Sequence, residues 1–185
     1  MMARRTHRRF TAPAAPVVAH ALAAALFMVL AGCQPPGRSD LPPPPSAADV
    51  RPYYAYGGEL EVQITGNVAR VEVVVDPAPY ARGGDLWAKG MPYLFLFSPG
   101  TRDALNDFPG LGGVRLVTRH PNGDVMAEAL LIRGTLNDYS WRQALNVAAQ
   151  ARRDATERPG RMRDLVQWGE DHTEFEYNPR YISTP

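Results

Sequence analysis

Apolar residues recur at every second position in two neighbouring segments. In 60–64 and 68–76, valine, isoleucine and leucine alternate with mainly polar residues, and this period of two predicts two half-buried strands. Gly66-Asn67 between them is a turn signal. The segment 93–97, with the sequence YLFLF, is apolar on both faces and predicts a central strand.

Two more apolar segments, 114–119 and 125–132, flank the sequence Pro121-Asn122-Gly123-Asp124. An Asn-Gly pair in this position is typical of a tight β-hairpin. Five short strands with Gly- and Pro-rich connections predict an antiparallel β-sandwich domain over residues 53–134.

The strand pattern resembles bacterial immunoglobulin-like domains at two places. Residues 68–76 are similar to the third strand of those domains, and residues 113–132 are similar to their final hairpin. The resemblance implies an immunoglobulin-like sandwich, without a disulfide because the chain has one cysteine. The connections 77–91 and 98–112 read as long loops, which often form binding surfaces.

The region 135–185 predicts a pair of helices packed on the sandwich. Ser140 and Gln143 fit a capping box. Helical spacing follows at Trp141, Ala144, Leu145, Ala148 and Ala155. Pro159-Gly160 interrupts the pattern, and a shorter helix around Leu165 ends at Gly169. The predicted fold class is therefore α+β, an antiparallel β-sandwich followed by a C-terminal helical pair.

The first 32 residues have the order of a secretory signal: four arginines, then the apolar stretch 17–30, which is too short to span a membrane, then small residues. Leu30-Ala31-Gly32-Cys33 resembles the lipobox of bacterial lipoproteins. The resemblance implies cleavage between Gly32 and Cys33, a diacylglyceryl thioether on the Cys33 sulfur and an acyl chain on its new α-amine. Such an anchor holds the protein on a membrane.

Residues 33–52 predict a lipid-anchored tether, because seven prolines follow Cys33 and few residues there have apolar surface to bury. A polyproline II spacer of this length reaches about 60 Å. A rival interpretation makes 42–45 a ligand for an aromatic groove. Gln34 rather than aspartate follows the lipid site, which favours the outer membrane by the sorting rule of some lipoproteins, with the domain facing the periplasm.

Charge and composition exclude several classes of protein. Without residues 1–32 the net charge is about −3, which argues against a nucleic-acid binder. Only His120 and His172 remain, and Cys33 is the sole cysteine, so a Cys- or His-rich metal centre is excluded. No cofactor is predicted.

Two enzyme alternatives remain open. His172, Glu174 and Glu176 offer hard-cation ligands, although the same segment also fits an ordinary edge strand with a solvated acidic face. Ser98 with His120 could belong to a serine hydrolase, but the flanks of Ser98 do not fit a nucleophile elbow.

Four aromatic residues complete the candidate sites. Tyr53, Tyr54, Tyr56 and Trp87 could stack on sugar rings of a cell-wall polymer, or they could pack the first strand onto the core. The leading prediction is a lipid-anchored envelope protein with a non-catalytic binding or scaffolding role towards another envelope protein. A carbohydrate- or peptidoglycan-binding module is the alternative, ahead of a small hydrolase.

Overall fold

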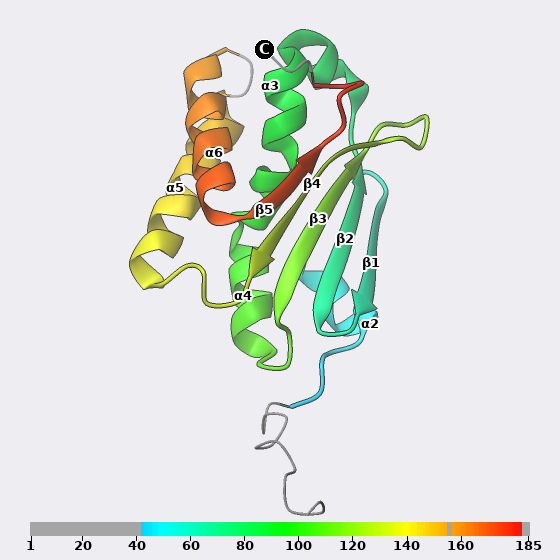
Figure 1. The fold of residues 1–185 in the computed structure, drawn as a ribbon, viewed down its shortest axis with the longest axis vertical. Helices are drawn as coiled ribbons and strands as arrows, with labels where there is room; N and C mark the ends of the chain where they lie inside the picture. The colour runs from blue at the N-terminus through cyan, green and yellow to red at the C-terminus, as the bar shows by residue number, and fades with distance from the viewer. Residues whose placement is uncertain (1–41, 155–156, 183–185) are drawn as a thin grey trace, which may run out of the picture. The chain divides into compact units, whose positions relative to one another are not determined.

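One five-stranded sheet with helices on one face forms the folded unit, which spans Leu41–Pro185 (Figure 1). The computed structural model describes residues 42–154 and 157–182. Neighbouring strands pair antiparallel except β2 and β3, which are parallel. In spatial order the strands are β1 (Leu60–Thr65), β2 (Val68–Val74), β3 (Gly113–Arg119), β4 (Val125–Ile132) and β5 (Glu174–Tyr177).

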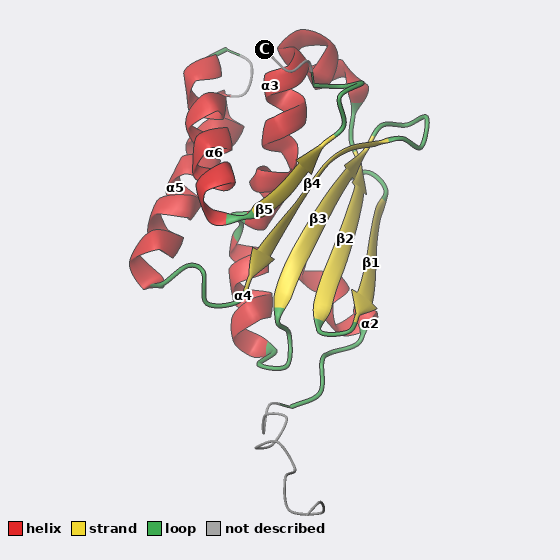
Figure 2. Cartoon of the chain, viewed as in Figure 1, coloured by secondary structure: helices red, strands yellow, loops and turns green. Residues whose placement is uncertain are grey.

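The helices lie behind the sheet and beyond its β5 edge (Figures 1 and 2). Helix α3 packs directly on β3 and β4, and the helical pair α5 and α6 packs on α3. The helical segments are α2 (Ala47–Val50), the 3₁₀ segment η1 (Arg51–Tyr53), α3 (Pro77–Leu96), α4 (Pro99–Asp107), α5 (Asp138–Asp154) and α6 (Pro159–His172).

The prediction of an antiparallel, immunoglobulin-like sandwich is wrong. The segment 93–97, expected as a central strand, lies at the C-terminal end of α3. Tyr93, Leu96 and Phe97 are buried because this helix lies between the sheet and α6. A helix buried on several sides is apolar all round, so its periodicity does not distinguish it from a buried strand.

Both expected long loops are also helical. Asp76 caps α3, its carboxylate accepting from the Ala78 amide at 2.9 Å, and Ser98 caps α4 in the same way through the Thr101 amide. Proline stands at the start of each helix, where its missing N–H costs nothing. The helical crossover from β2 to β3 is what makes these two strands parallel, since a parallel pair needs a long connection.

The two predicted hairpins are confirmed. Turns at Gly66 (φ 61°) and Gly123 (φ 93°) join β1 to β2 and β3 to β4. The edge-strand interpretation of the segment after His172 is also confirmed, because β5 pairs with β4 at the edge of the sheet.

The C-terminal helices form, with different ends from those predicted. Asn137, not Ser140, caps α5 by accepting the Tyr139 and Ser140 amides at 3.0 Å. Helix α6 continues through Gly169, where a Cβ atom would lie 2.4 Å from the Tyr93 ring. This glycine therefore permits close helix packing and does not end the helix. Ala155, at the end of the predicted stripe, lies outside the described residues.

The folded unit begins earlier than residue 53. Ser46 caps α2 in a capping box with Asp49, and Val50 is fully buried. The Pro42 and Pro43 carbonyls lie against Gly110. The C-terminal part of the predicted tether 33–52 thus belongs to the folded unit, whereas the signal peptide, Gly32 and Cys33 lie outside the described residues.

Candidate functional site: an aromatic groove

A groove of ≈ 530 Å³ opens on the surface of the described part of the chain. We call it the aromatic groove. Its walls come from η1 and the segment after it, from α3, from the start of α4 and from α5, so four separate elements must pack before it exists. It is lined by Tyr53, Tyr54, Ala55, Tyr56, Trp87, Met91, Leu94, Phe95, Ser98, Pro99, Gly100 and Arg152.

All four aromatic residues singled out in the sequence line this groove, but they differ in role. Tyr54 is buried, its hydroxyl lies 3.1 Å from the Thr101 Oγ1 atom, and burial raises its pKa to about 12. Tyr54 is therefore a structural wall residue whose hydroxyl is already used.

Tyr53 and Tyr56 are only partly buried. The Tyr53 hydroxyl donates to the Asp107 carboxylate at 2.6 Å, and this bond raises the pKa of Tyr53. The Tyr56 hydroxyl donates to the Val74 carbonyl at 2.9 Å, and burial raises the pKa of Tyr56. Each ring also meets a phenylalanine edge to face, at 5.6 Å for Tyr53 with Phe108 and 5.5 Å for Tyr56 with Phe95.

Two lining residues carry hydrogen-bond donors that the fold does not exhaust. The Trp87 indole N–H is buried and has no acceptor among the described residues. Arg152 donates through Nη2 to the Leu94 carbonyl, and no other hydrogen bond of its guanidinium is present in the described part of the chain. A guanidinium has five N–H donors, so most of them remain available.

The groove has little polar chemistry beyond these donors. Its other polar side chains are the tyrosines and Ser98, whose Oγ accepts the Thr101 amide at 3.2 Å and lies 3.4 Å from the Thr101 hydroxyl. An apolar hollow with a few polar groups is the usual form of a binding site.

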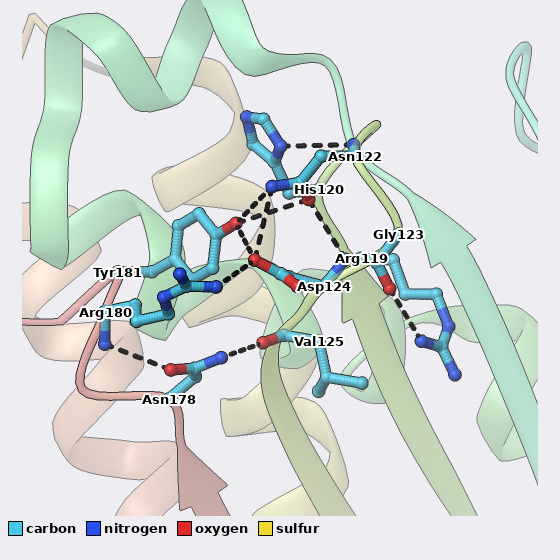
Figure 3. A network of polar contacts seen from close by, with 9 residues as sticks. All are labelled: Arg119, His120, Asn122, Gly123, Asp124, Val125, Asn178, Arg180 and Tyr181. Carbon is cyan, nitrogen blue, oxygen red and sulfur yellow. Dashed lines mark hydrogen bonds and ion pairs between the residues drawn. The ribbon is translucent and has the colours of Figure 1, made fainter.

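The structure does not bring Ser98 and His120 together. Ser98 caps α4, whereas His120 lies in the β3–β4 hairpin, where its Nδ1 accepts the Asn122 amide at 3.3 Å (Figure 3). The His120 ring lies against Tyr181, with 5.4 Å between centroids. The ring contact of His120 with Tyr181 thus joins the hairpin to the C-terminal tail, and the serine-hydrolase arrangement is absent from these residues.

The proposed cation ligands are likewise not assembled. The His172 ring stacks on Trp168 at 4.1 Å, and its Nδ1 lies 2.8 Å from the Trp168 carbonyl. Glu174 and Glu176 are exposed on β5. Among residues 42–154 and 157–182, no group of three or more His, Cys, Asp or Glu side chains could hold a metal ion.

Sequence reasoning missed Met91, Leu94, Phe95 and Arg152 as lining residues. The sequence pattern predicts a loop or a strand for the first three, and it explains Arg152 as a charge that complements the end of a helix. The helical spacing of Trp87, Met91 and Leu94 would have placed them on one face of a helix, but Gly83-Gly84 and Pro92 in the same segment obscure that spacing.

No known protein family, curated protein or solved structure matches this chain. None of the helices in the described residues is both long and apolar enough to cross a bilayer.

Proposed function

We propose that the protein is a lipid-anchored component of the bacterial cell envelope that binds another envelope protein through the aromatic groove and catalyses no reaction. Cys33 carries the lipid, and the folded unit faces the periplasm from the outer membrane. The observation that carries the binding role is the groove itself, an apolar hollow with a guanidinium that makes one hydrogen bond among the described residues.

The start of the folded unit limits the length of the tether that follows Cys33. Nine residue steps separate Cys33 from Pro42, which lies against Gly110. A fully extended chain of that length spans about 30 Å, half the reach expected when the tether extended to residue 52. A lipid on Cys33 therefore lies at most about 30 Å along the chain from Pro42.

The geometry favours a protein partner over a sugar polymer. Sugar binding uses open aromatic faces together with polar groups for the many hydroxyls. In the groove the Tyr53, Tyr54 and Tyr56 hydroxyls already contact groups of the protein itself, and Tyr54 is almost entirely buried. Apolar side chains of a protein match such a lining better, because burying apolar surface needs no hydrogen bonds.

The lipid anchor is tested by metabolic labelling with palmitate in the native host. Label should enter the wild-type chain and should be lost in Cys33→Ser, which removes the acylated sulfur. The wild-type protein should sediment with membranes and the variant should not. An unlabelled wild-type chain with an intact Met1 start contradicts the anchor.

The partner is tested by photo-crosslinking in living cells. A benzophenone amino acid at Ala55, which lines the groove, should give one discrete adduct that mass spectrometry identifies as an envelope protein. The matched control is the same probe at Gln63, an exposed position on β1 outside the groove. No adduct at Ala55, or the same adducts at both positions, contradicts binding through the groove.

A further inference from the structure

We propose that the aromatic groove receives an extended segment of the partner protein, which adds a short strand along residues 54–56, inserts one apolar side chain into the groove and places an acidic group on Arg152. This inference rests on the function proposed above and specifies the chemistry of the partner.

The main chain beside the groove is extended at Tyr54 and, within the described part of the chain, free of hydrogen bonds at Ala55. Tyr54 has φ −115° and ψ 107°, within the extended region. Its own backbone is occupied, because the amide donates to the Arg51 carbonyl at 3.2 Å and the carbonyl accepts from Arg51 Nη1 at 2.7 Å. The next residue, Ala55, is exposed, and no hydrogen bond of its backbone N–H or C=O is present among the described residues.

An exposed extended segment next to an apolar hollow suits strand addition. In that mode main-chain hydrogen bonds give affinity, and a hollow beside the added strand selects one side chain. Because successive side chains of a strand point to opposite faces, one residue of the incoming segment enters the groove while its neighbours point away.

The charge of the groove selects an acidic segment. Arg152 is the one charged side chain among the described residues that line it, and no carboxylate lines it. The bond from Arg152 Nη2 to the Leu94 carbonyl holds the guanidinium at the groove wall. A carboxylate can accept from two of the remaining donors in parallel, which gives direction as well as attraction.

The test uses the full-length protein in detergent and a library of random heptapeptides with free C-termini. Selection should enrich peptides with one large apolar residue next to an aspartate, a glutamate or the terminal carboxylate. Arg152→Gln should weaken a selected peptide about three- to tenfold, since it removes a charge-assisted bond at a partly exposed site. The matched control Arg153→Gln, on an adjacent arginine whose side chain is 74% exposed, should leave affinity unchanged.

Ala55→Pro tests the added strand. It removes the Ala55 N–H and asks Tyr54 for an extended conformation that Tyr54 already has. Affinity should fall about tenfold while the thermal midpoint stays unchanged. Ala55→Ser keeps the N–H and should lose less affinity than Ala55→Pro.

Three outcomes overturn the inference: no enriched peptide, enriched peptides whose affinity ignores both Arg152→Gln and Ala55→Pro, or an acyl lipid retained in the groove by native mass spectrometry. An adduct from Ala55 in cells together with any of these outcomes leaves the proposed function standing and removes the strand-addition mode. Selected peptides without any adduct in cells support the strand-addition mode and contradict the proposed binding of an envelope protein.

Discussion

The aromatic groove and the helix-free face of the sheet are both open to solvent, yet they satisfy their polar groups differently. On the sheet face Glu72 lies 2.6 Å from Arg70 Nε and 2.5 Å from Arg119 Nε, and Arg115 pairs with Glu128. Beneath these charges Val117 is fully buried, with Glu72 and Glu128 as its register partners. In the groove, by contrast, the Trp87 indole N–H is unpaired and the lining is mainly apolar.

This difference gives a criterion for distinguishing a candidate binding surface from a surface whose polar groups are paired within the protein. On the sheet face, ion-paired side chains of Glu72, Arg119, Arg115 and Glu128 cover Val117. The groove leaves apolar surface exposed beside the Arg152 guanidinium, which makes one hydrogen bond among the described residues. If the two regions differ in this way, substitutions in them should change the free energy of unfolding by different amounts.

The largest effect is expected for Tyr54→Ala in the groove wall. Removing a buried aromatic ring costs about 3–5 kcal/mol in the free energy of unfolding. The matched change on the sheet face is Gln63→Ala at an exposed position, which should stay within about 0.5 kcal/mol of wild type. Urea denaturation measures both, and equal losses would contradict the comparison.

The groove region should also lose stability in alkali. Burial raises the pKa of Tyr54 in the groove wall, and of Tyr93 where α3 packs on α6, to about 12 from the usual value of about 10. Because the folded pKa lies above the unfolded one, this stability is present below pH 10 and is lost as the pH rises towards 12. The loss is on the order of 2–3 kcal/mol per tyrosine.

Urea midpoints at increasing pH, followed together with phenolate absorbance, measure this loss. Tyr54→Phe should remove its own part of the pH dependence. A pH profile identical to wild type would show that Tyr54 ionises as easily in the folded protein as in the unfolded chain.

A smaller loss is expected where the helical layer packs closely. A Cβ atom at Gly169 would lie 2.4 Å from the Tyr93 ring, so Gly169→Ala overpacks the contact between α6 and α3. The expected cost is about 1–3 kcal/mol. Gly57→Ala is the control, because nothing lies within 4 Å of a Cβ atom there. Thermal melts that place both variants at the wild-type midpoint contradict this packing.

The smallest effect is expected on the sheet face, in Glu72→Gln. Hydrogen bonds from Arg119 and Arg70 lower the pKa of Glu72 below its usual value. A depressed folded pKa stabilises the fold above the unfolded pKa, and this contribution is lost as the pH falls through the folded pKa. Wild type should exceed Glu72→Gln by about 1 kcal/mol at neutral pH. Urea midpoints should converge in acid, and a gap that widens there reverses the predicted sign.

The hairpins could be predicted from the sequence, but the fold class could not. The β1–β2 and β3–β4 hairpins have local signals, Gly66 and Gly123 in their turns, which act within a few residues. The segment 93–97 has no such signal, because a helix and a strand that are buried on several sides are both apolar throughout. A strand at 93–97 predicts a sandwich, whereas the structure has a helix there and a mixed sheet covered by helices.

The candidate site was predicted in part for a similar reason. Tyr53, Tyr54, Tyr56 and Trp87 attract attention as aromatic residues in any fold, so their types were enough to name them. The sequence gives no reason to place Arg152 at a binding site, because the helix dipole already explains an arginine near the end of a helix. Only its bond to the Leu94 carbonyl, from a helix 58 positions away, places it at the groove.

The amino-acid sequence by itself determined the local elements: the alternating strands, their glycine turns and the amphipathic C-terminal helices, all of which depend on residues close together in the chain. Only the tertiary structure decided that α3 crosses over to make β2 and β3 parallel, that one sheet face stays free of helices, and that four distant segments enclose a groove. These features depend on packing between residues far apart in the chain, and no local pattern records such packing.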